Sequence, residues 1–134
     1  MALVKILTNG TETGLTAANK INTAFDVIDE LSLSRVITET GVAAYMPDLD
    51  NYNYFEYTVT ENYTIHSPVN QMVGRGGTLV IKQDGVGGWI ETWGTDWIFP
   101  NGDPTLDTTA GRINFFRFMC VDTNKILIEY IADL

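Results

Sequence analysis

The C-terminal part of the chain contains its clearest fold signal: Arg112-Ile113-Asn114-Phe115-Phe116-Arg117-Phe118-Met119-Cys120-Val121, followed by Lys125-Ile126-Leu127-Ile128-Glu129-Tyr130-Ile131. Both runs are rich in β-branched and aromatic residues, which favour strands. Between them lies Asp122-Thr123-Asn124, and residues of these types suit a tight turn. The sequence therefore predicts a β-hairpin at this end of the chain.

More short strands precede this hairpin, and turn residues separate them. Residues 55–60 alternate apolar and polar side chains, and a short turn leads from them to a second strand at residues 63–66. Residues 78–83 and 89–93 flank a glycine-rich segment, and glycine reaches the positive φ angles that tight hairpin turns need. Both pairs are predicted to form hairpins. We see no internal repeat.

One amphipathic helix is predicted near the N-terminus, where residues 17–33 contain neither proline nor glycine. The apolar residues of its stripe are spaced by three, four and three positions, and they are Ala18, Ile21, Phe25 and Ile28. An exposed stripe of this kind needs an apolar partner. The stripe packs either on the domain's own sheet or, as we favour, against copies of itself.

The chain has 134 residues, enough for one ordinary core with a terminal appendage. About seven short strands with no helix between them predict a mainly-β fold, an antiparallel β-sandwich or barrel-like domain. We therefore divide the chain into an N-terminal attachment segment and oligomerisation helix, residues 1–33, and a β-domain, residues 34–134.

The charge of the chain argues against two classes of partner. Eight Lys and Arg stand against 17 Asp and Glu, which gives a formal net charge of −9. Nucleic acids and anionic membranes both recruit cationic surfaces, so neither is an expected partner. No apolar run approaches the roughly 18 residues of a membrane-spanning helix, so we expect no membrane insertion.

Residue types that carry chemistry are sparse. The only histidine is His66, and the only cysteine, Cys120, lies in an apolar strand where a buried hydrophobic role is predicted. The segment 48–53 fails as an EF-hand calcium loop, which leaves Asp48 and Asp50 as ligands of a loosely held surface ion in a weaker alternative. We expect no catalytic residue, no cofactor and no built metal site.

Aromatic side chains are the best candidates for ligand contacts, because their faces stack on the apolar faces of sugars. The alternative is that they fill the core or a subunit interface, which we favour for Trp93. The candidates for glycan contact are Tyr52, Tyr54, Tyr63, Trp89 and Trp97.

Two stretches of the chain resemble proteins of tailed bacteriophages. Residues 11–25, which include Thr16-Ala17-Ala18-Asn19-Lys20-Ile21-Asn22, resemble the N-terminal segment of many phage tail and fibre proteins. From Tyr57 onward the chain resembles a β-domain found at the ends of phage fibres. Trp93-Gly94 followed by Phe99-Pro100-Asn101-Gly102 is similar to the signature turn of that domain.

The resemblance implies a non-enzymatic structural protein on the surface of the phage particle. It implies a short homotrimeric fibre or spike that contacts other virion proteins of the capsid, neck or tail, and a host-surface polysaccharide. The N-terminal segment is then expected to attach to the particle through its apolar residues Leu3, Val4, Ile6 and Leu7. The alternative is a capsid decoration or neck protein that binds no receptor. An enzyme remains a third and weaker hypothesis.

Overall fold

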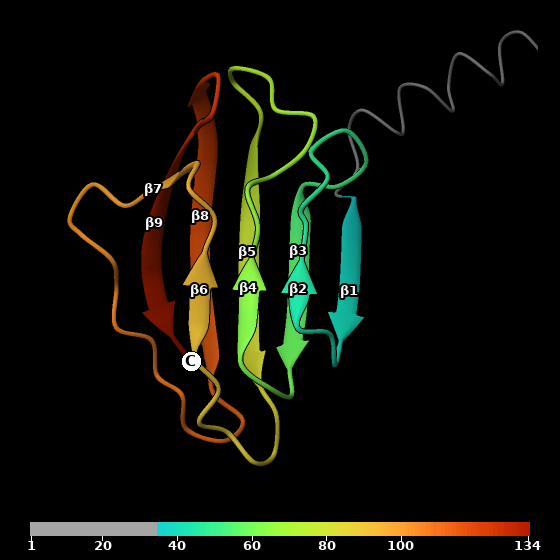
Figure 1. The fold of residues 1–134 in the computed structure, drawn as a ribbon, viewed down its shortest axis with the longest axis vertical. Helices are drawn as coiled ribbons and strands as arrows, with labels where there is room; N and C mark the ends of the chain where they lie inside the picture. Colours follow the sequence, from blue (N-terminus) through green and yellow to red (C-terminus); the bar gives the residue numbers. More distant parts are fainter. Residues whose placement is uncertain (1–34) are drawn as a thin grey trace, which may run out of the picture. The chain divides into compact units, whose positions relative to one another are not determined.

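The computed structural model describes residues 35–134, which belong to the second of two units into which the chain divides, Ser34–Leu134. These residues form strands and loops with no helix, so the mainly-β prediction is confirmed for them (Figure 1). The strands are β1 (Val36–Thr40), β2 (Ala44–Tyr45), β3 (Tyr54–Val59), β4 (Tyr63–Ile65), β5 (Gly76–Gln83), β6 (Glu91–Trp93), β7 (Trp97–Ile98), β8 (Ile113–Asp122) and β9 (Lys125–Asp133).

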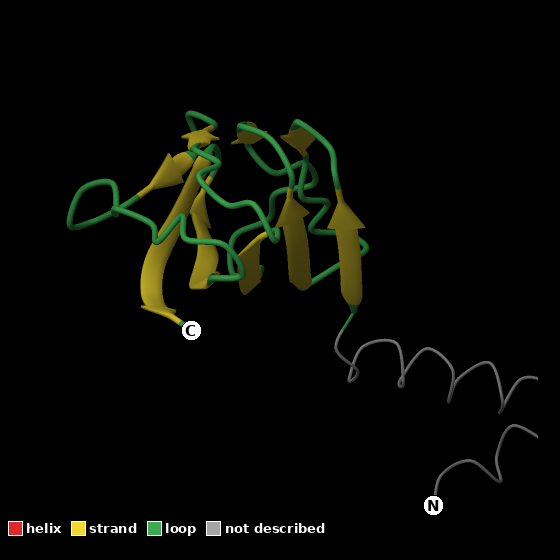
Figure 2. Cartoon of the chain, turned by 90° about the horizontal axis from the view of Figure 1, so that it is seen from below, coloured by secondary structure: helices red, strands yellow, loops and turns green. Residues whose placement is uncertain are grey.

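The first six strands form three coils of a short parallel β-solenoid. The chain passes back and forth between a six-stranded sheet, in the order β1-β3-β5-β8-β9-β7, and a three-stranded sheet, in the order β2-β4-β6. Each strand pairs in parallel with the strand one coil earlier, as Tyr54 does with Val36 and Thr64 with Ala44. Figure 2 shows the two sheets as facing layers.

The last strands close one side of the larger sheet. Strand β8 is antiparallel to β5 and to β9, and the short strand β7 adds in parallel to β9. The predicted C-terminal hairpin is thus confirmed, and Asn124 takes a positive φ of 57° in its turn. Because β8 covers the free edge of β5, the third coil is not left with unpaired backbone groups in this sheet.

The antiparallel arrangement predicted for the rest of the domain was wrong. Strands β3 and β4 do not pair, nor do β5 and β6, since the two strands of each pair lie in different sheets. Apolar and polar residues alternate along a strand whether it pairs in a hairpin or in a solenoid coil. Glycine with a positive φ suits a solenoid corner as well as a hairpin turn, and Gly87 and Gly88 have φ of 72° and 86°.

The three coils were also not recognisable as a repeat in the sequence. The partner of Val36 in the next coil is Tyr54, 18 residues later, whereas the partner of Tyr54 is Thr78, 24 residues later. Loops of different length at the corners produce this difference, so the sequence has no fixed period.

The core fills the space between the two sheets. Tyr45 from the small sheet stacks on Tyr57 from the large one, with ring centroids 4.1 Å apart. Phe116 is fully buried and its ring meets those of Trp93 and Tyr130. Each fully buried side chain of this size contributes roughly 1.5–3 kcal/mol. Cys120 is also buried, as predicted.

Candidate functional site

Two groups of predicted site residues lie outside the described residues. They are the helix stripe, Ala18, Ile21, Phe25 and Ile28, and the attachment residues, Leu3, Val4, Ile6 and Leu7.

Two of the five aromatic candidates for glycan contact are core residues. Tyr63 is 2% exposed and Trp97 is 7% exposed. The indole nitrogen of Trp97 donates to the backbone carbonyl of His66 at 3.0 Å, which fixes the ring inside the domain. Neither ring offers a face on which a sugar could stack, so the prediction was wrong for these two residues.

The other three candidates are half-buried, and the structure does not bring them together. Tyr52 packs edge-on against Phe55, with ring centroids 6.2 Å apart. Tyr54 is on the outer side of β3, because its neighbour Phe55 points into the core. No aromatic contact among the described residues joins Tyr52, Tyr54 and Trp89 to one another. The three rings therefore do not stack on one another.

Trp89 is the most firmly anchored of the three. Its indole nitrogen donates to Oδ1 of Asp84 at 2.8 Å. Its backbone nitrogen donates to Oε1 of Gln83 at 3.1 Å, and its carbonyl accepts from Nε2 of the same residue at 2.9 Å. Trp89 and Tyr52 are partly buried and pack against the core cluster, and so does Trp93, as expected for it.

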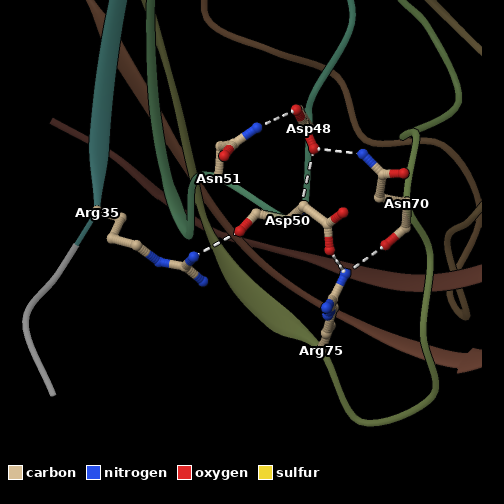
Figure 3. A network of polar contacts seen from close by, with 6 residues as sticks. All are labelled: Arg35, Asp48, Asp50, Asn51, Asn70 and Arg75. Atoms are coloured by element: carbon tan, nitrogen blue, oxygen red, sulfur yellow. Dashed lines mark hydrogen bonds and ion pairs between the residues drawn. The ribbon is translucent and has the colours of Figure 1, made fainter. Parts of the chain in front are cut away.

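A polar network occupies the corner that follows β2 (Figure 3). The Oδ1 atom of Asp48 accepts from the backbone nitrogen of Asp50 at 3.0 Å and from Nδ2 of Asn70 at 2.8 Å. Its Oδ2 atom accepts from Nδ2 of Asn51 at 2.6 Å. These amide donors favour the ionised carboxylate and lower the pKa of Asp48. Arg75 pairs with Asp50 and donates to the carbonyl of Asn70 at 2.8 Å.

This network joins the corner of the first coil to that of the second. A parallel bridge between Asp48 and Val69 lies beside it, and Asn70 adopts a positive φ of 58° there. Both carboxylates face amide or guanidinium donors, an arrangement that suits a structural clamp more than a cation site. Within residues 35–134 no group of three or more His, Cys, Asp or Glu side chains is placed to hold a metal ion.

The most distinctive surface is the outer face of β8 and β9, which we call the β8–β9 face. Its exposed aliphatic residues are Met119 (51% exposed), Val121 (45%), Leu127 (41%) and Ile131 (47%). Arg117 and Glu129 lie opposite each other on the two strands, near the middle of this face. The apolar side chains and this pair of charges form a continuous surface.

A hollow of about 850 Å³ lies on this face. Residues of β5, β8 and β9 line it, and the loop 99–104 forms a further part of its lining. Its lining includes apolar side chains such as Leu127 and Phe99 and the three charged residues Asp103, Arg117 and Glu129. The hollow can therefore receive an apolar group together with a charged one.

Sequence analysis did not single out this surface, although a signal for it was present. In β8 both the odd-numbered and the even-numbered positions include large apolar residues. The inward positions, such as Phe116 and Phe118, fill the core, and the outward positions, such as Phe115 and Met119, are then in excess. A strand that is apolar on both sides indicates burial on both sides.

The comparisons with known proteins add no family. Neither protein-family models nor curated proteins nor solved structures include a match to this chain. Among the described residues, there is no helix with the length and apolar character needed to cross a membrane.

Proposed function

We propose that this chain is a non-enzymatic structural component of a tailed-phage particle. It assembles as a homotrimeric short fibre or spike, with the residue 17–33 helix at its centre and the N-terminal segment on the particle. The observation that carries the proposal is a β-solenoid with a large apolar sheet face, the β8–β9 face, on the outside of its larger sheet.

The stacked coils of the solenoid support a structural role. Each coil is joined to the next by backbone hydrogen bonds in both sheets, and the core runs continuously from coil to coil. Such stacking produces a stiff body whose stability grows with each neighbouring coil. Corner contacts such as the Asp48 network add side-chain ties between coils.

The apolar outer face supports assembly into a larger particle. Monomeric soluble proteins rarely expose a contiguous apolar patch beyond a few hundred Å². Four large aliphatic residues of β8 and β9, each between 41% and 51% exposed, occupy neighbouring strands here. A protein that is built into an oligomer and a virion buries such a face.

Contact with the host is assigned to the aromatic residues that remain at the surface. Trp89 is the best placed, because Asp84 and Gln83 hold its ring and backbone before any ligand binds. A held aromatic ring loses little conformational entropy on stacking against a sugar. We therefore assign host-surface glycan contact to Trp89 first, and to Tyr52 and Tyr54 second.

Two measurements on the phage that encodes the chain test this proposal. Mass spectrometry of density-purified particles is expected to find the protein, and its absence would overturn the virion role. Purified protein added to host cells is expected to slow phage adsorption, and Trp89→Ala is expected to weaken this competition. If the particles contain the protein but it does not compete, the chain is a decoration or neck component and the host-contact role fails.

A further inference from the structure

The β8–β9 face differs in charge from the chain as a whole. The chain carries a formal net charge of −9, so two copies repel each other over most of their surfaces. At the centre of this face one cation, Arg117, lies opposite one anion, Glu129. The remaining exposed members named above are aliphatic. The charges of these two central residues cancel, and Asp103 beside the hollow adds one further carboxylate. Two copies that approach through the centre of this face therefore repel each other less than they would elsewhere on their surfaces.

Among residues 35–134, Arg117 differs from four of the other five Lys and Arg side chains; the fifth, Arg35, donates to the backbone carbonyl of Asp50. Arg75, Lys82, Arg112 and Lys125 each form an ion pair with a carboxylate. Arg117 has no carboxylate within 4.0 Å among residues 35–134, although Glu129 is its cross-strand neighbour. Arg117 is also an exposed residue of β8.

We propose that the β8–β9 face is the contact surface between copies of this chain, and that Arg117 of one copy pairs with Glu129 of the next. The inference rests on the proposed trimer and names the surface that closes it. Since the cation is on β8 and the anion on β9, each copy presents a positive side and a negative side. This arrangement suits head-to-tail contacts that close into a ring.

The aliphatic residues supply the affinity in this interface. Met119 and Leu127 are cross-strand partners, and both line the hollow described above. Burying them against apolar residues of neighbouring copies removes apolar area from water. The charged pair then selects the direction and register of the contact, as charges in interfaces commonly do.

Light scattering coupled to gel filtration on the full-length chain tests the surface. The wild type is expected at three times the 14.9 kDa chain mass. Leu127→Glu and Met119→Glu are expected to elute as single chains at the same concentration, with unchanged β-sheet circular dichroism. Leu127→Ser replaces the first variant if a glutamate disturbs folding.

Val86→Glu is the matched control. Val86 is 75% exposed in the turn between β5 and β6, away from the β8–β9 face. The same apolar-to-acidic change there is expected to leave the trimer intact. A monomeric wild type, or trimers that persist in both Leu127→Glu and Met119→Glu, would overturn the inference. Detection of the protein in particles would still support the virion role in that case.

A charge exchange tests the pairing. Arg117→Glu is expected to raise the dissociation constant of the oligomer at least about tenfold, because it places like charges across the interface. Adding Glu129→Arg restores the opposite charges and is expected to recover most of the affinity. Failure of the double variant to recover would remove the Arg117–Glu129 pair from the proposal.

Discussion

Gly94 lies directly against the backbone of Ser67, so that a Cβ atom on Gly94 would be 2.3 Å from the Ser67 nitrogen. The same Cβ atom would be 2.8 Å from the carbonyl carbon of His66. In addition, the backbone nitrogen of Gly94 donates to the carbonyl of Ile65 at 2.7 Å. The third coil thus follows the second with backbone against backbone at this corner, where only glycine fits.

Gly94→Ala is therefore expected to destabilise the domain by about 1–3 kcal/mol, since backbone atoms must move to admit the methyl group. Gly85→Ala is the control, because no atom lies within 4 Å of a Cβ at Gly85 and its φ is not positive. Urea denaturation of both variants measures the free energy of unfolding. Equal effects in the two variants would show that close approach at Gly94 is not the cause.

The Asp48 clamp predicts a pH-dependent difference in stability. Hydrogen bonds from Asn70 and Asn51 lower the pKa of Asp48 below its ordinary value of 3.8. The lowered pKa adds to the free energy of unfolding at pH values above 3.8. This contribution is lost as the pH falls through the lower pKa of Asp48 in the folded state. Asp48→Asn is expected to be less stable than the wild type at neutral pH, and the gap should narrow below pH 3.8.

Urea unfolding at a series of pH values checks this prediction. Glu61→Gln is the control, because Glu61 is an exposed residue that takes no part in the network. Its difference from the wild type is expected to stay small over the same range. A gap for Asp48→Asn that remains constant as the pH falls would contradict the assigned role of the carboxylate.

Two buried tyrosines have hydroxyl groups whose removal is not expected to destabilise the domain. The hydroxyl groups of Tyr57 and Tyr63 are buried and have no hydrogen-bond partner among residues 35–134, whereas that of Tyr45 donates to the Thr58 carbonyl at 3.2 Å. Tyr57→Phe is expected to be neutral or to stabilise the domain by up to about 1–2 kcal/mol, because it removes a desolvated hydroxyl group. Tyr45→Phe is expected to cost about 0.5–1.5 kcal/mol. Thermal unfolding of both variants measures whether each substitution raises or lowers the stability of the domain.

The same residues predict behaviour at alkaline pH. Burial raises the pKa of Tyr57 and of Tyr63 well above the ordinary value of 10.0. In the unfolded chain these phenols ionise near pH 10.0. The free energy of unfolding is therefore unaffected by this ionisation below that pH, and it decreases as the pH rises above it. Phenolate absorbance is expected to show that Tyr57 and Tyr63 ionise only as the protein unfolds. Their ionisation before any loss of circular dichroism would contradict this prediction.

The sequence predicted the candidate site less well than it predicted the fold. Trp97 and Tyr63 are aromatic residues next to polar ones, and nothing in the sequence distinguishes an aromatic ring at the surface from one in the core. Burial depends on which residues lie across the interior. Trp97, for example, meets Phe118 from β8, 21 residues further along the chain.

The sequence by itself determined the class of structure: short strands, their approximate limits and the C-terminal hairpin. These follow from local properties, namely alternation, β-branched residues and the turn at Thr123 and Asn124. Only the tertiary structure decided which strands pair and that β3 and β4 belong to different sheets. The physical reason is that side-chain alternation reports on which face of a strand is buried, whereas pairing depends on backbone hydrogen bonds between residues far apart in the chain.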